Sequence, residues 1–293
     1  MLDPKTIDDS FARFLELLAY VRETDGEVLR SDLLFDIESI DGRRLDELLT
    51  SRDFDRDLRA ELFGRLDKVE TYGEDPPGLE VVVDDQVLSW APSVALCLAK
   101  TLKGLPMGSL TTAAGGLRGA RDVKLRGDSL AGTVHFLVDA DDAPAFWRAV
   151  IHAEPDAVTR LDRYGHLPFP NCVFAPEVWR QINSFDGAIL DNWPLLLANL
   201  AGLDDHAVRI WGENVESAVR QRLMSSVAGV NCSPESPGTH RNSAAMRRRR
   251  VRFGDREIVC EWHAKLQRDR NRVHFAVEDG RVFVGIFVGH LPT

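Results

Sequence analysis

A strict alternation of apolar and polar residues near the end of the chain constrains the fold more than any other feature. In residues 257–266 (EIVCEWHAKL), every second position is apolar, and the same holds for Val273, Phe275 and Val277. Successive side chains of a strand point to opposite faces, so this period predicts two strands with one apolar face each. The next run, VFVGIFVG (282–289), is apolar on both faces, which predicts a central strand covered on both sides.

The apolar faces of the first two strands have to meet the same core, and this requirement fixes how they pair. Trp262 is expected opposite Phe275 and Ala264 opposite Val273. His263 then faces His274, and Lys265 faces Arg272, with Cβ atoms about 4.5–5.5 Å apart. A slip of one residue would bury the charged side chains, so the register is strongly specified.

The polar side of this hairpin is expected to gather five residues, which are Glu261, His263, Lys265, Arg272 and His274. Such a patch suits a phosphodiester, because histidine can transfer protons while lysine and arginine stabilise charge on phosphate. RNA cleavage through the 2′-hydroxyl needs only such groups, so no cofactor and no metal are expected. Two alternatives stay open. One is a metal site built from His263, His274 and Glu261, which the neighbouring cations disfavour, and the other is a solvated sheet face without chemistry.

Charge is unevenly distributed along the chain. Residues 1–100 hold 24 acidic and 12 basic residues, whereas residues 241–281 hold 12 basic and 6 acidic ones. This argues against attraction of the whole protein to nucleic acid and favours a local anion-binding surface. The four cysteines are widely spaced and form no metal motif, and no apolar run reaches the roughly 20 residues of a membrane span. A cytoplasmic protein without a membrane partner is therefore expected.

The pattern along the chain predicts an α+β protein with four regions. These are an acidic helical region (1–75), a mainly helical α/β region (78–228), a loop or linker (229–250) and an antiparallel β module (251–293). The linker prediction follows from the Ser, Pro, Gly and Asn content of GVNCSPESPGTHRNSAAM, which has no apolar period.

Three shorter stretches carry their own expectations. Pro92 is expected to open a helix that ends near Leu102. The glycine-rich segment 106–122 lacks the spacing of a phosphate-binding loop, so a flexible connection is expected there. Asp139, Asp141 and Asp142 follow a predicted strand, where they can cap the next helix or hold Mg²⁺, and capping is favoured.

The runs WHAKL, NRVHF and DGRVFVGIFVGHLPT resemble the terminal strands of the RelE/ParE-type small bacterial toxins. The resemblance covers about the last 40 residues and implies a ribonuclease-like site on these strands. By this resemblance, His290 joins Glu261, His263, Lys265, Arg272 and His274 as a candidate catalytic residue.

The sequence therefore predicts a toxin-like effector of bacterial antiphage defence. Its basic C-terminal region would act on RNA or the ribosome, and its acidic N-terminal helices would bind a protein partner. The alternative is a non-catalytic interaction subunit of a defence complex.

Overall fold

The computed structural model describes residues 4–24, 26–32, 34–36, 44–52, 54–72, 80–88, 91–112, 116–126, 130–153 and 161–291. It divides into two compact units, Met1–Phe146 and Trp147–Thr293. Both units combine helices with mostly antiparallel sheets, so the α+β class is confirmed. The predicted boundary between the regions 1–75 and 78–228 lies outside the described residues. No helix among those described is both long and apolar enough to cross a bilayer.

The first unit contains two apolar cores. One lies among α1, α2 and α3, and the other lies between α4 and a five-stranded sheet of order β4-β3-β6-β7-β5. The helices are α1 (Pro4–Glu23), η1 (Leu34–Asp36), α2 (Leu45–Thr50), α3 (Arg56–Leu66), α4 (Pro92–Leu102) and η3 (Ala140–Asp142). The strands are β1 (Leu29–Ser31), β2 (Glu70–Tyr72), β3 (Val81–Val83), β4 (Gln86–Leu88), β5 (Gly108–Leu110), β6 (Gly119–Leu125) and β7 (Ala131–Leu137).

Local predictions in this unit had mixed outcomes. The helix from Pro92 to Leu102 is confirmed. The glycine-rich segment is not a flexible connection throughout, because β5 pairs with β7 in parallel and β6 pairs with β7 along its whole length. The sequence signal for β6 was weak, because only Val123 and Leu125 are large apolar residues at alternate positions and glycine and alanine begin the strand.

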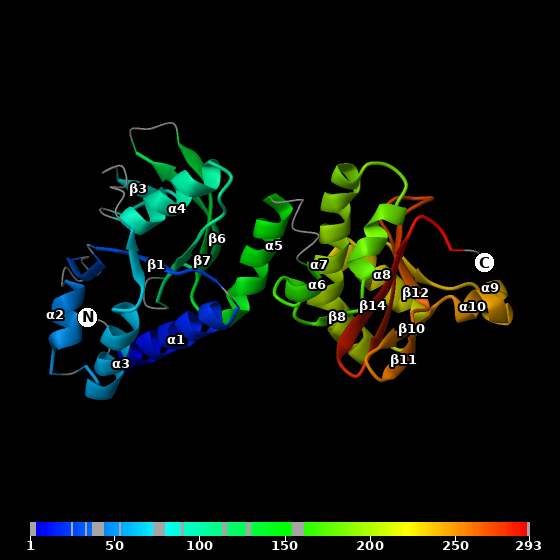
Figure 1. Cartoon of the computed structure of the whole chain (residues 1–293), viewed down its shortest axis with the longest axis horizontal. Coiled ribbons are helices and arrows are strands. Elements are labelled where there is room, and N and C mark those ends of the chain that lie inside the picture. Colours follow the sequence, from blue (N-terminus) through cyan, green and yellow to red (C-terminus); the bar gives the residue numbers. More distant parts are fainter. Residues whose placement is uncertain are drawn as a thin grey trace. The chain divides into compact units, whose positions relative to one another are not determined.

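The second unit is built on a sheet of order β8-β14-β13-β12-β9. Strand β14 lies near its centre, between parallel β8 and antiparallel β13, so the predicted central strand is confirmed. Helices α7 and α8 cover one face of this sheet (Figure 1). The helical elements are α5 (Ala143–Ala153, which crosses the division), α6 (Leu161–Tyr164), η5 (Val178–Ser184), α7 (Ile189–Glu213), α8 (Ser217–Ala228), α9 (Pro237–Arg241) and α10 (Ser243–Arg247). The strands are β8 (Cys172–Phe174), β9 (Cys232–Pro234), β10 (Arg250–Phe253), β11 (Arg256–Val259), β12 (Trp262–Lys265), β13 (Arg272–Glu278) and β14 (Arg281–Val288).

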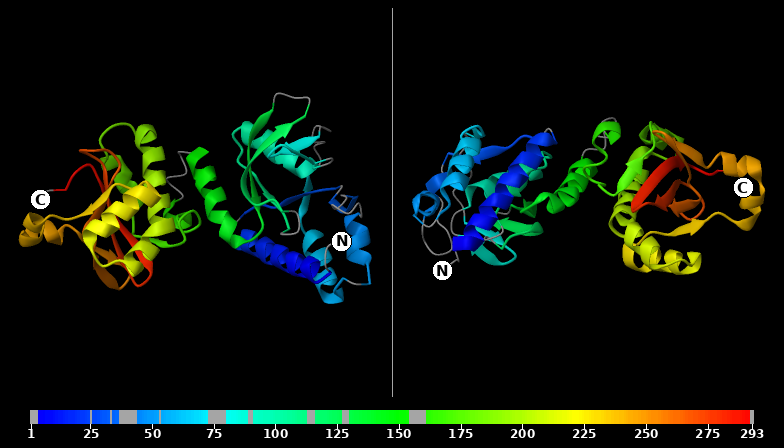
Figure 2. Two further views of the ribbon diagram at one scale, coloured as in Figure 1. Left: turned by 180° about the vertical axis from the view of Figure 1, so that it is seen from behind. Right: turned by 90° about the horizontal axis from the view of Figure 1, so that it is seen from below.

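The segment expected to be a loop or linker (229–250) is part of this second unit. Its residues form β9, α9 and α10, and β9 pairs with β12 as an edge strand of the main sheet. Helices α9 and α10 project beyond the sheet near the end of the chain (Figure 2). The C-terminal strands are therefore not a separate module, since β8 and β9, which come earlier in the sequence, complete their sheet.

The predicted strand over 257–266 is two strands that belong to different sheets. Strand β11 pairs with β10 in a two-stranded hairpin, and β12 joins the main sheet after a break at Cys260 and Glu261. The hairpin packs against part of the face that α7 does not cover, with Phe253 on Phe283 at 5.2 Å between ring centroids. A Cβ atom at Gly285 would lie 2.5 Å from the Cys260 sulfur, so this close approach requires glycine.

Candidate functional site

The predicted register of the terminal hairpin is confirmed. His263 pairs with His274 and Lys265 with Arg272, and the two imidazole centroids lie 5.4 Å apart. Trp262 and Phe275 point to the opposite face, where Trp211 of α7 packs on both rings. The apolar pattern thus set the pairing as expected.

The carboxylate predicted beside the histidines is not Glu261. The chain breaks between β11 and β12 at this residue, and the Glu261 carboxylate lies 3.9 Å from the His240 ring with 46% of its side chain exposed. Alternation across 257–266 could not reveal this break, because each half keeps its own period of two. The inclusion of Glu261 in the patch is therefore wrong.

Glu235 takes the place that was expected for Glu261. Its Oε1 lies 3.5 Å from Nδ1 of His263 and 3.6 Å from Nδ1 of His274. Its backbone N–H donates to the carbonyl of Glu261, which extends the pairing of β9 with β12 and fixes the carboxylate beneath the two rings. We refer to Glu235, His263 and His274 as the His–Glu cluster. Sequence reasoning missed Glu235 because it lies in the Ser- and Pro-rich stretch that shows no strand period.

Two further side chains hold the His–Glu cluster. Arg249, itself 1% exposed, places its Nε 2.7 Å from the same Oε1 of Glu235. The Ser233 hydroxyl lies 3.2 Å from Nε2 of His263 across the β9–β12 pair. Both groups come from the segment expected to be a linker. Tertiary structure thus brings a serine, a carboxylate and a guanidinium to the histidines.

Burial governs the protonation of the cluster. His274 is 1% exposed, and burial lowers its pKa to about 3, with a smaller contribution from nearby His263. Burial would raise the pKa of Glu235, but the adjacent His263 imidazole and Arg249 guanidinium outweigh it and lower this pKa to about 2. At neutral pH the cluster thus contains an ionised Glu235 and a neutral His274.

Several buried nitrogens of this region have no hydrogen-bond partner among the described residues. They are Nδ1 of His263, both ring nitrogens of His274 and Nη1 of Arg272. Buried polar atoms are paired in most proteins, so a group of such atoms in one place indicates a missing ligand or an ordered water. These atoms mark the region as a candidate site.

At one end of the same face, Lys265 and Arg272 form what we call the cationic pair. They are directly opposed across β12 and β13, and both side chains are partly exposed. Neither forms an ion pair with a carboxylate in the described part of the chain, whereas the buried Arg249 of the same unit does. Opposed like charges destabilise a sheet, so the cationic pair is suited to an anion.

His290 lies at the same end of the sheet but outside the cluster. It is exposed and follows the end of β14, one residue after Gly289, whose carbonyl accepts from the Asn271 backbone N–H at 2.9 Å. Because Arg272 pairs with Val288, the last residue of β14, His290 lies at the same end of the strands as the cationic pair. The predicted site residues therefore divide into an inward group, His263 and His274, and an outward group, Lys265, Arg272 and His290.

The aspartates after β7 are capping groups, as expected. Asp139 accepts the Asp141 N–H, Asp142 accepts the Val138 N–H, and Arg118 forms ion pairs with both Asp139 and Asp142. These contacts are those of capping carboxylates, which is the role favoured for them from the sequence.

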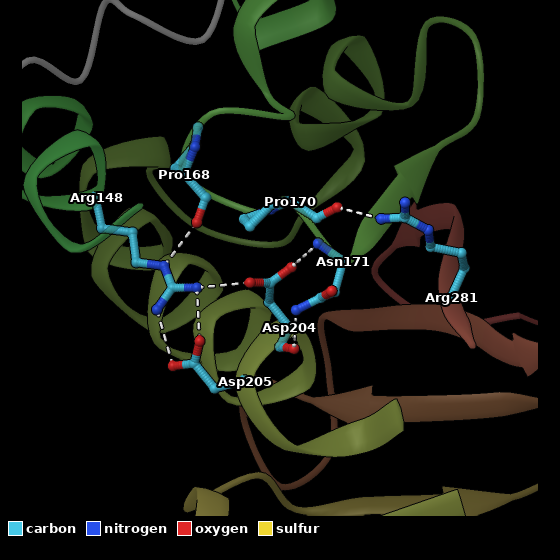
Figure 3. Close-up of polar contacts among 7 residues, drawn as sticks. All are labelled: Arg148, Pro168, Pro170, Asn171, Asp204, Asp205 and Arg281. Atoms are coloured by element: carbon cyan, nitrogen blue, oxygen red, sulfur yellow. Dashed lines mark hydrogen bonds and ion pairs between the residues drawn. The ribbon is translucent and has the colours of Figure 1, made fainter. Parts of the chain in front are cut away.

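A second buried carboxylate–arginine network lies in the same unit (Figure 3). Arg148 contacts Asp204 and Asp205 at 2.8 Å each and donates to the Pro168 carbonyl. The other Asp204 oxygen accepts the Asn171 N–H at 2.7 Å. Each charged group here has a partner, which is typical of a structural network.

A comparison of the chain with protein-family models, curated proteins and solved structures found no match.

Proposed function

We propose that this protein is a toxin-like effector that acts on RNA, free or in the ribosome, through the cationic pair of its C-terminal sheet. The observation that carries the proposal is the direct opposition of Lys265 and Arg272 without a carboxylate partner in the described residues. Two cations at this spacing match a phosphate group, and arginine can contact two phosphate oxygens at once. The resemblance of the terminal strands to RelE/ParE-type toxins adds support.

The residues have distinct roles in this proposal. Lys265 and Arg272 bind the phosphate and stabilise the negative charge that develops on it. His290 is the exposed imidazole at the same end of the sheet, and it transfers the proton. His263 and His274 are buried in the His–Glu cluster, and their role in this proposal is to stabilise strands β12 and β13, which hold the cationic pair. A buried His274 that stays neutral is poorly suited to exchanging protons with RNA.

The proposed reaction is transesterification within RNA. The 2′-hydroxyl loses its proton to a base, and its oxygen forms a bond to the neighbouring phosphorus. The bond from phosphorus to the 5′-oxygen breaks, this oxygen takes up a proton, and a 2′,3′-cyclic phosphate remains. The step needs neither an oxidant nor an added nucleophile.

The proposal is tested by RNA binding and cleavage with the full chain. Lys265→Ala and Arg272→Ala should each lower the slope of log affinity against log salt by about 0.7, the value for one contact to single-stranded RNA. Arg256→Ala is the matched control, because Arg256 lies in the same unit but is paired with Glu278 and Asp279. Equal RNA affinity and salt slope in all four proteins would overturn the proposal.

Cleavage and toxicity separate an effector from an interaction subunit. Wild-type protein should release 2′,3′-cyclic phosphate ends from RNA and inhibit bacterial growth when expressed, whereas the double variant Lys265→Ala/Arg272→Ala should do neither. His290→Ala should retain RNA binding and lose cleavage. Absence of both RNA binding and growth inhibition in the folded wild type would favour the alternative of a non-catalytic subunit.

A further inference from the structure

The His–Glu cluster converges on one point inside the second unit. Each residue offers one ligand atom, and the three atoms lie within 4.8 Å of one another. Two of the separations are known individually, at 3.5 Å and 3.6 Å from Oε1 of Glu235 to the two Nδ1 atoms. Ligands of a zinc ion at about 2.0–2.2 Å lie roughly 3–3.5 Å apart, so only a small contraction would close the cluster on an ion.

Burial and missing hydrogen bonds point to a ligand at this place. His274 is 1% exposed, and its Nδ1, like that of His263, has no hydrogen-bond partner among the described residues. The side chains of His263 and Glu235 are 12% and 5% exposed. A neutral imidazole nitrogen left unpaired in such surroundings is unfavourable, whereas the same lone pair is a good ligand for a transition-metal ion.

The surrounding groups are those that orient metal ligands. The Ser233 hydroxyl lies 3.2 Å from Nε2 of His263, so its oxygen can accept a hydrogen bond from the Nε2–H and favour the tautomer whose Nδ1 is free to coordinate. Arg249 contacts Oε1 of Glu235, which has a second lone pair available for a cation. Arg249 also holds this carboxylate in its ionised form, the form that binds metals.

We infer that Glu235, His263 and His274 bind a divalent first-row transition-metal ion of the zinc class, through Oε1 and the two Nδ1 atoms. Two imidazoles and one carboxylate are ligands of zinc and of its neighbours in the row, and they are a poor set for Mg²⁺ or Ca²⁺, which prefer oxygen. Three protein ligands leave at least one position for water or an anion. An anionic fourth ligand would offset the charge of Arg249 beside the ion.

The ion would tie together segments that are far apart in the sequence. Glu235 follows the edge strand β9, whereas His263 and His274 belong to β12 and β13. Binding to the folded state alone stabilises that state, by about 2.7 kcal/mol when the free ion is at a hundred times its dissociation constant. The site thus goes beyond the proposed RNA activity, because it joins the edge strand β9 to β12 and β13, the two strands that hold the cationic pair.

The inference is tested by zinc binding to the full chain after treatment with a chelator. Wild type should bind one Zn²⁺ per chain in calorimetry and metal analysis, and Co²⁺ should give the visible absorption of a low-coordinate site. Glu235→Gln and His263→Ala should weaken zinc affinity by at least about tenfold. His240→Ala is the matched control, since His240 is an exposed histidine whose described ion pair is with Glu261 alone.

Circular dichroism shows whether each variant is folded, and Ser233→Ala tests the site without removing a ligand. Ser233→Ala retains all three ligands and should lower zinc affinity about tenfold in a folded protein. The inference would be overturned if folded wild type bound no zinc, or if wild type, Glu235→Gln and Ser233→Ala bound zinc with equal affinity. The unpaired nitrogens of the cluster would then be explained by an ordered water. Lys265→Ala should lose RNA affinity and keep zinc, so failure of the RNA proposal and of the metal inference are distinguishable.

Discussion

Two buried carboxylate–arginine pairs among the described residues of the second unit differ in how completely their polar atoms are hydrogen-bonded. Asp204 is held by Arg148 and by the Asn171 N–H, and Arg148 uses its remaining donors on Asp205 and Pro168 (Figure 3). Glu235 is held by Arg249 at a similar distance, yet it faces two imidazoles whose Nδ1 atoms have no hydrogen-bond partner among the described residues. A complete network stabilises a fold, whereas an incomplete one indicates a ligand.

The two buried carboxylates, Asp204 and Glu235, also differ in the direction in which their pKa is shifted. Burial raises the pKa of Asp204 despite Arg148 and the backbone N–H of Asn171. The pKa of Glu235 is about 2, because the adjacent His263 imidazole and Arg249 guanidinium outweigh the effect of burial. The carboxylate that faces the histidines is therefore the more firmly ionised of the two, as a ligand for a cation has to be.

The largest expected effect is on the complete network. Asp204→Ala removes a buried partner of Arg148 and leaves the Asn171 N–H unpaired, so it should lower the free energy of unfolding by about 3–5 kcal/mol. Urea denaturation measures this loss. Asp205→Ala is the control, because Asp205 is 46% exposed on its side chain and should cost under about 1 kcal/mol. Equal losses in the two variants would contradict the view that burial makes the Asp204 pair important.

The next effect is the pH dependence that His274 confers on the metal-free protein. Its pKa is lowered to about 3 in the fold, against about 6.5 for an unfolded histidine, so between these values the unfolded state binds the extra proton. Stability should therefore fall as pH falls below about 6.5, by up to about 1.4 kcal/mol per pH unit. Urea denaturation with chelator at pH 7.5, 6 and 5 gives the free energy of unfolding at each pH. In folded His274→Gln this free energy should depend less steeply on pH than in wild type. An unchanged dependence in this variant would show that His274 does not titrate as its burial requires.

A smaller effect is expected from the group that orients His263. Ser233→Ala removes one partly buried hydrogen bond and should lower the free energy of unfolding by about 1 kcal/mol in metal-free protein. In excess zinc the loss should grow by about 1.4 kcal/mol, because the tenfold weaker zinc affinity expected of this variant also lowers its stabilisation by the ion. An equal loss with and without zinc would show that Ser233 does not contribute to zinc binding.

The smallest effect on stability, of opposite sign, concerns the cationic pair. Lys265→Ala removes one of two opposed like charges, so the free energy of unfolding should rise by about 0.2–1 kcal/mol at low salt. Thermal denaturation at low and high salt checks this, because screening should abolish the gain. A loss of stability would mean that Lys265 holds the fold together and would weaken its assignment to an anion site.

The sequence by itself determined the pairing of the terminal strands. One apolar face on each of two strands permits a single register, and that register brought His263 to His274 and Lys265 to Arg272. The α+β class and the Pro92 helix also follow from local patterns, because periodicity and capping depend on residues a few positions apart.

Only the tertiary structure decided which residues complete the site. Glu235, Arg249 and Ser233 lie in a stretch with no strand period, and they reach the histidines because β9 adds to the edge of β12. Glu261 has the right alternation but lies where the chain passes from one sheet to another. Burial of His274 was likewise beyond sequence reasoning, because alternation assigns a side chain to a face and does not show what packs against that face.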